Sequence, residues 1–140
     1  MNSLKLNLIT AAATFIAATA TASAQSTLNA NVPFSFSVSS RTMLPAGDYN
    51  VVRTNVTADT WAFIDKQTGH KTLVALGQPD QSRRGDPAKL EFRCHADHCA
   101  LTKIQVGNGE AGYELHPKIT KAEAENAALV VVPLTRGAAE

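Results

Sequence analysis

The sequence has almost no net charge, which excludes one broad class of partner. Its 13 Lys and Arg residues stand against 12 Asp and Glu residues, so the formal net charge of the 140 residues is +1. A chain without an excess of positive charge has no electrostatic attraction for nucleic acid or for an anionic membrane surface. We therefore expect no nucleic-acid partner.

The short motifs that mark common enzymes are also missing. The chain contains no G-x-S-x-G, S-x-x-K or H-E-x-x-H motif and no glycine-rich phosphate loop. Its acidic residues are scattered, so no pair of carboxylates points to general acid–base chemistry. An enzymatic role stays open, but the sequence favours a non-enzymatic one and predicts no cofactor.

Aromatic residues are few, with one Trp, two Tyr and five Phe in the chain. Tyr49, Trp61 and Phe63 could line a carbohydrate-binding or peptide-binding surface. With so few aromatic side chains available, a place in the hydrophobic core is the simpler interpretation of these three.

Long hydrophobic runs are absent except at the start of the chain. There Lys5 precedes an apolar stretch over residues 6–20, and Ala22-Ser23-Ala24 forms an A-x-A cleavage site. This order is typical of a secretory signal peptide, which we expect to be cut after Ala24 to leave Gln25 as the mature N-terminus. The stretch is shorter than the about 20 apolar residues that a membrane-spanning helix needs.

Removal of residues 1–24 would leave one β-rich domain, residues 25–140, with a formal net charge of zero, because Lys5 is the only charged residue that is lost. The mature chain has no second long apolar run, so we expect no membrane span in it. Export would place it in the periplasm or outside the cell, where disulfide bonds persist.

The mature chain contains several short segments with the pattern of β-strands. In residues 32–38 the side chains of Val32, Phe34, Phe36 and Val38 share one face, as in a half-buried strand, and Pro33 suggests an edge position or the start of a strand. Residues 25–30 are polar and predicted to lie outside the strands. Further strands are expected at residues 49–56, 61–64, 71–76, 89–94, 99–106, 113–116 and 129–132, the last ended by Pro133. Strands at this spacing predict a mainly β fold, either an antiparallel β-sandwich or a small barrel.

One segment has a different periodicity. Thr120-Lys121-Ala122-Glu123 matches the S/T-x-x-E capping box, and several alanines follow it, so we expect one short C-terminal helix over residues 121–128. The longest predicted loop, residues 77–88, is rich in Gly, Pro and Asp. Its Arg84-Gly85-Asp86 tripeptide is explained by ordinary loop composition.

Two motifs resemble those of a family of small, exported, functionally uncharacterised bacterial proteins. Residues 31–38 read NVPFSFSV and residues 44–51 read LPAGDYNV, similar to the family signature VPFxFxV followed by LPAGxYxV. The resemblance covers residues 31–52 and is looser beyond them. It implies export, one β-rich domain and a bacterial source, and it brings no catalytic residues. The chain departs from the family at residues 94–99, where an aromatic-rich hairpin is usual.

That departure is the hexapeptide Cys94-His95-Ala96-Asp97-His98-Cys99. In an oxidising compartment, two cysteines this close indicate a disulfide first. Pairing them across a hairpin places Phe92 opposite Leu101 and Leu90 opposite Lys103. A regular ladder would then turn Ile104 away from the core, so we expect a β-bulge near Thr102 that returns Ile104 and Val106 to it.

A metal site is one alternative for this segment, and two free thiols are another. Cys94, His95, His98 and Cys99 are two thiols and two imidazoles, the ligand types that zinc prefers. Successive hairpin residues point to opposite faces, so all four would meet only on an irregular loop. With the disulfide formed, His95 and His98 would still be cross-strand neighbours that could hold a divalent metal, with help from His70 or His116. Otherwise they are two solvated side chains at a polar turn.

The sequence therefore favours an exported β-rich domain with a binding or structural role at the cell envelope and an envelope protein or a glycan as partner. Candidate contact surfaces are the loop 77–88 and the hairpin tip 94–99, because loops on a rigid scaffold carry most function. The alternative is a small metal-binding or metal-dependent envelope protein that uses His95 and His98. A third hypothesis has residues 32–38, as an exposed edge, pairing with another chain.

Overall fold

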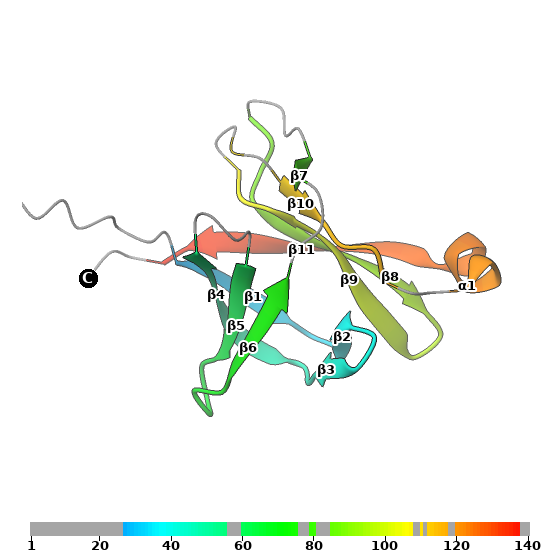
Figure 1. Ribbon diagram of the computed structural model, residues 1–140, viewed down its shortest axis with the longest axis horizontal. Coiled ribbons are helices and arrows are strands. Elements are labelled where there is room, and N and C mark those ends of the chain that lie inside the picture. Colours follow the sequence, from blue (N-terminus) through cyan, green and yellow to red (C-terminus); the bar gives the residue numbers. More distant parts are fainter. Residues whose placement is uncertain are drawn as a thin grey trace, which may run out of the picture.

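The computed structural model describes residues 27–55, 60–75, 79–80, 85–107, 110, 112–117 and 120–137. The predicted signal peptide and its cleavage site between Ala24 and Gln25 lie outside these residues. Figure 1 shows a mainly β architecture with one short helix, as the sequence predicted.

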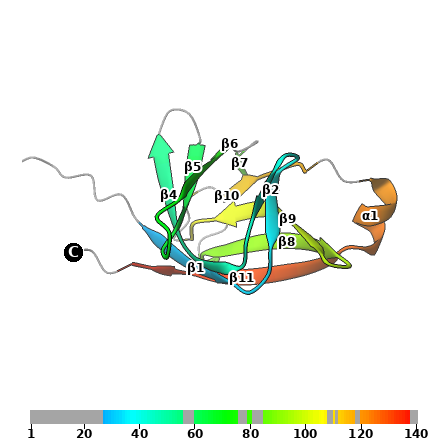
Figure 2. The ribbon, with the colours of Figure 1, turned by 90° about the horizontal axis from the view of Figure 1, so that it is seen from below.

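The strands follow one another through a single continuous sheet that curls into a half-barrel (Figures 1 and 2). One layer consists of β1 (Leu28–Val32), β4 (Gly47–Asn55), β5 (Thr60–Asp65) and β6 (Lys71–Ala75). The other consists of β3 (Thr42–Leu44), β2 (Phe36–Ser39), β9 (His98–Gln105), β8 (Lys89–His95) and β11 (Ala128–Arg136). Two short strands, β10 (Gly112–Glu114) and β7 (Pro79–Asp80), branch from β9, and α1 (Lys121–Asn126) precedes β11.

The long strand β11 joins the two layers. It pairs with β8 as far as Pro133 and with β1 from Leu134 onwards. The prediction that Pro133 ends this strand is wrong. The Leu134 N–H donates to the Ala88 carbonyl oxygen, on the β8 side, at 3.0 Å. Backbone nitrogens of successive strand residues point to opposite sides, so the nitrogen of Pro133 faces β1, one residue before the β1–β11 ladder begins. A proline is tolerated there because no ladder bond needs its missing N–H.

The predicted strand over residues 32–38 is two strands. The chain leaves β1 at Val32, passes through Pro33, and enters β2 at Phe36 in the other layer. Neither half is an edge, because β1 lies between β11 and β4, and β2 lies between β3 and β9. The edge hypothesis for this segment is therefore wrong. So is the prediction that residues up to Ala30 lie outside the strands, since Leu28 in β1 is fully buried.

The sheet is not antiparallel throughout. Strand β2 runs parallel to β9, with Phe36 opposite Cys99 and Ser37 opposite Ala100. The crossing from one layer to the other determines this direction, because β2 arrives beside β9 from β1 rather than through a hairpin. All other strand pairs among the described residues are antiparallel.

Aromatic side chains hold the two layers together. Phe36 contacts Tyr49 and Phe63 of one layer at ring-centroid distances of 5.7 and 5.9 Å, and Phe92 of the other layer at 5.2 Å. Tyr49, Trp61 and Phe63 are all buried, as the simpler interpretation of the sequence predicted. Edge-to-face and tilted arrangements of this kind add to the stabilisation from burial alone. The inner face of the half-barrel is therefore a packed core.

Candidate functional site

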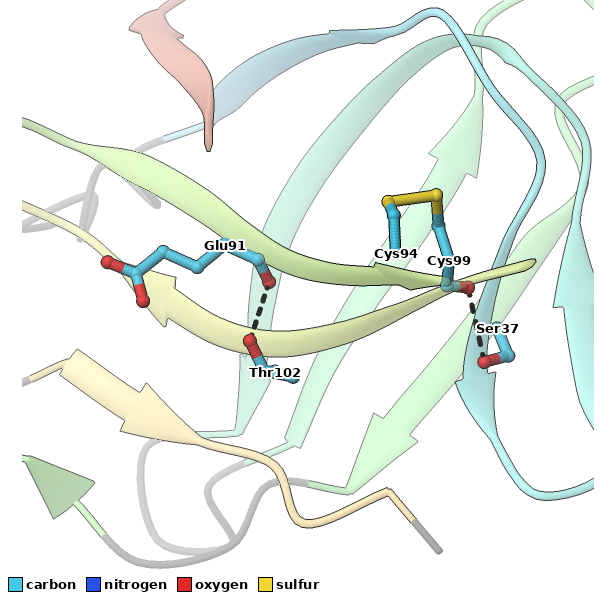
Figure 3. Close-up of a disulfide and its surroundings, with 5 residues drawn as sticks. All are labelled: Ser37, Glu91, Cys94, Cys99 and Thr102. Atoms are coloured by element: carbon cyan, nitrogen blue, oxygen red, sulfur yellow. Dashed lines mark hydrogen bonds between the residues drawn. A yellow bond between two sulfur atoms is a disulfide. The ribbon is translucent and has the colours of Figure 1, made fainter. Parts of the chain in front are cut away.

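The hairpin formed by β8 and β9 is closed by a disulfide between Cys94 and Cys99, as the sequence predicted (Figure 3). The two residues are directly opposed, and their Cα atoms are 4.0 Å apart. Both sulfur atoms are therefore committed to one another, which removes the cysteines from any set of metal ligands.

The predicted bulge is present. Phe92 lies opposite Leu101, but Glu91 lies opposite Lys103, so Thr102 is the additional residue of β9. The Thr102 hydroxyl donates to the Glu91 carbonyl oxygen at 3.1 Å across the ladder (Figure 3). The shift places Leu90 opposite Ile104, and the side chain of Ile104 is fully buried. The bulge thus keeps the apolar residues of both strands on the inner face.

The same register brings the two histidines together at the tip. His95 and His98 are the last pair of the ladder, and Ala96 and Asp97 form the turn between them. Ala96 has φ of +50° and is the one residue other than glycine with positive φ among those that the structure describes. The left-handed conformation costs a residue with a Cβ about 1–2 kcal/mol. Such strain is often found at functional sites.

A groove of about 440 Å³ lies between the outer face of this tip and α1, and we call it the tip groove. Figures 1 and 2 show α1 beside the β8–β9 tip. The described residues that line the groove are Arg93, His95, Ala96, Asp97, His98, Ala100, Glu123 and Ala127. Three alanines form an apolar part of the lining, and the other residues present charged groups of both signs and two imidazoles.

The predicted capping box fixes Glu123 at the wall of the groove. The Glu123 carboxylate accepts from the Thr120 backbone N–H and hydroxyl, both at 2.9 Å, and the Thr120 hydroxyl accepts from the Glu123 N–H at 3.3 Å. The helix ends at Asn126 rather than Ala128 because Ala127 is already extended and leads into β11.

The charge of Glu123 is stabilised by its surroundings. The pKa of its carboxyl lies below the ordinary value of 4.5, first because the Thr120 backbone N–H donates to it and then because the Thr120 hydroxyl does. The imidazoles of His95 and His98 lower the same pKa through their charge. Glu123, His95 and His98 all line the tip groove.

The remaining candidate ligands lie elsewhere. His70 lies between β5 and β6, outside the described lining of the groove. His116 lines a neighbouring hollow of about 200 Å³ that shares Arg93 with the groove. Among the residues that the structure describes, no group of three or more His, Cys, Asp or Glu side chains is arranged to hold a metal ion.

The outer face next to the groove carries exposed apolar side chains. Leu129 and Val131 of β11 are 51% and 47% exposed, and they lie opposite Arg93 and Glu91 of β8. A further hollow of about 170 Å³ shares His98 and Ala100 with the groove.

Sequence reasoning missed two residues of the tip groove, Arg93 and Glu123. Arg93 could have been found from the sequence, because residues two apart on a strand share a face and Arg93 is two residues before His95. The position of Glu123 beside the hairpin tip depends on tertiary structure, which the sequence pattern does not show.

The other predicted contact surface, the loop 77–88, is only partly described. Pro79 and Asp80 form β7, which pairs with β10, so the loop is not structureless throughout. Arg84 of the tripeptide lies outside the described residues.

Comparison with known proteins finds no relative of this chain: no family model, no curated protein and no solved structure matches it. In the described part of the chain, no helix is both long enough and apolar enough to cross a membrane.

We expect the disulfide to stabilise the domain modestly, because the loop that it closes is short. Replacing Cys94 and Cys99 together by Ala should lower the free energy of unfolding in urea by about 2 kcal/mol. A reductant should destabilise the wild-type protein by a similar amount and leave the double variant unchanged. Equal stability of the wild type and the double variant would contradict the assignment.

The lowered pKa of Glu123 predicts a pH dependence of α1. A carboxyl with a lower pKa in the folded state stabilises that state above its unfolded pKa, and the contribution is lost as the pH falls through the lowered value. A carbon-13 titration should give Glu123 a midpoint below 4.5. Thr120→Ala removes the hydroxyl and keeps the backbone N–H, so it should raise the midpoint part of the way back toward 4.5. A wild-type midpoint at or above 4.5 would refute the capping geometry.

Proposed function

We propose that this protein is an exported, non-enzymatic binding domain of the bacterial cell envelope, and that the tip groove is its recognition surface. The observation that carries the proposal is the way the tip is built. The disulfide lies on the inner face, while Arg93, His95 and His98 stand together on the outer face. Side chains held on a braced hairpin are suited to recognition, because little conformational entropy is lost on binding.

Export is supported by three independent features. Residues 1–24 have the tripartite pattern of a signal peptide. The Cys94–Cys99 disulfide belongs to oxidising compartments such as the periplasm. The resemblance of residues 31–52 to exported bacterial proteins points to the same compartment.

The composition of the groove favours a protein partner over a glycan. Its described lining has no Trp, Tyr or Phe side chain to offer a large apolar ring on which a sugar could stack. Arg93 stands beside the exposed Leu129 and Val131, and interfaces between proteins are enriched in Arg and bury apolar side chains at their centre. We therefore infer that the partner is a protein of the envelope.

Site-specific photo-crosslinking in living cells tests this function. A photoreactive amino acid at Leu129, beside the groove, should give a discrete cross-linked species, and the same substitution at Leu73 on β6 should not. Leu73 is a matched control because it is 61% exposed, against 51% for Leu129, and lies in the other layer. Arg93→Glu should abolish the species. Equal cross-linking at both positions, or none at Leu129, would refute the proposal.

A metal-binding role is the second candidate, because His95 and His98 are directly opposed as the last pair of the β8–β9 ladder and both line the tip groove. In that case zinc chloride should bind the disulfide-intact protein at one ion per chain, measured by calorimetry. His95→Ala or His98→Ala should remove the binding, and His70→Ala should not. Absence of saturable zinc binding would eliminate this candidate.

A further inference from the structure

A second pocket lies between the two layers, away from the hairpin tip. It has a volume of about 250 Å³ and is lined by Arg53, Trp61, Val106, Glu110 and Tyr113. Arg53 and Trp61 are a cross-strand pair of β4 and β5, and Tyr113 belongs to β10 of the other layer. We call it the mouth pocket. It shares none of its described lining with the tip groove.

Trp61 has a buried hydrogen-bond donor with no acceptor among the described residues. Its side chain is 2% exposed, and its indole Nε1 is buried with no hydrogen-bond acceptor in the described structure. Buried donors are almost always paired, and an unpaired one calls for an acceptor such as a water or a ligand atom. Tryptophan can only donate, so a ligand that pairs with this indole needs an acceptor oxygen or nitrogen.

The neighbours of Trp61 narrow the chemistry of that acceptor. The rings of Trp61 and Tyr113 are 6.1 Å apart and form an aromatic wall. The Arg53 guanidinium lies 5.4 Å from the centre of the Tyr113 ring. A guanidinium beside an indole donor favours a carboxylate, which only accepts and binds arginine with two parallel hydrogen bonds. The aromatic wall favours a small apolar body attached to it.

We propose that the mouth pocket binds a small organic carboxylate with an apolar ring or short chain, held through its carboxylate by Arg53 and Trp61. A volume of about 250 Å³ suits a ligand the size of benzoate and is below that of most drug-sized sites. Because the indole nitrogen is covered, the carboxylate reaches it only when neighbouring side chains shift. Glu110 is exposed at the rim, where its charge opposes that of the ligand.

The protein contains a single tryptophan, so its indole N–H gives one signal in a proton–nitrogen correlation spectrum. Titration with sodium benzoate at constant ionic strength should move this signal saturably and downfield, as a new hydrogen bond requires. Benzyl alcohol has a similar ring without the charge and should produce no saturable shift over the same range. An unmoved signal with benzoate, or equal shifts with both compounds, would overturn the proposal.

Variants separate the roles of the lining residues, with benzoate affinity measured by calorimetry. Arg53→Met should weaken binding by tenfold or more, and Arg41→Met, a matched change in the β2–β3 turn, should leave it unchanged. Trp61→Phe keeps an aromatic ring and removes the donor, so it should weaken binding about two- to tenfold. If Arg53→Met does not fold, Glu110→Gln on the exposed rim provides the test. It should tighten binding, and weaker binding would overturn the proposal.

Discussion

The register between β8 and β9 is the constraint on which the rest of the structure depends. The disulfide sets this register at the tip. Halfway along the hairpin, the bulge at Thr102 shifts the pairing by one residue, so that the following residues of β9 exchange faces. A slip by one residue would move every side chain of a strand to the opposite face. Ile104 would then leave the core, and His98 would leave the outer face of the hairpin. The disulfide and the bulge together therefore fix which side chains of this hairpin join the core and which line the tip groove.

The parts of the structure that could be predicted from the sequence are those determined by nearby residues. The hairpin, its disulfide and its bulge follow from the spacing of Cys94, Cys99 and Ile104 and from the alternation around them. The capping box of Thr120 and Glu123 needs only four consecutive residues. In each case the physical cause lies within one element or one turn, so the pattern is sufficient to identify it.

The parts that could not be predicted depend on where the chain changes layers. Residues 32–38 alternate regularly although Pro33 lies at a corner, because a chain that crosses a curled sheet can bury apolar residues on both sides of the corner. Pro133 occupies a similar position between two partners of β11. The placement of Glu123 in the same groove as His95 and His98 likewise depends on how α1 lies against β8. Periodicity reports which face is buried but not which layer buries it.

The pairing of β1 with β11 has a consequence for how the chain folds. Leu28 lies opposite Arg136, and Gly137 donates its N–H to Thr27 at 2.9 Å, so the first described strand and the last are neighbours at the centre of the sheet. The β1 ladder cannot be completed until β11 has been synthesised, and contacts between residues so distant in the chain form slowly. A polypeptide of this topology stays open until its last strand is available.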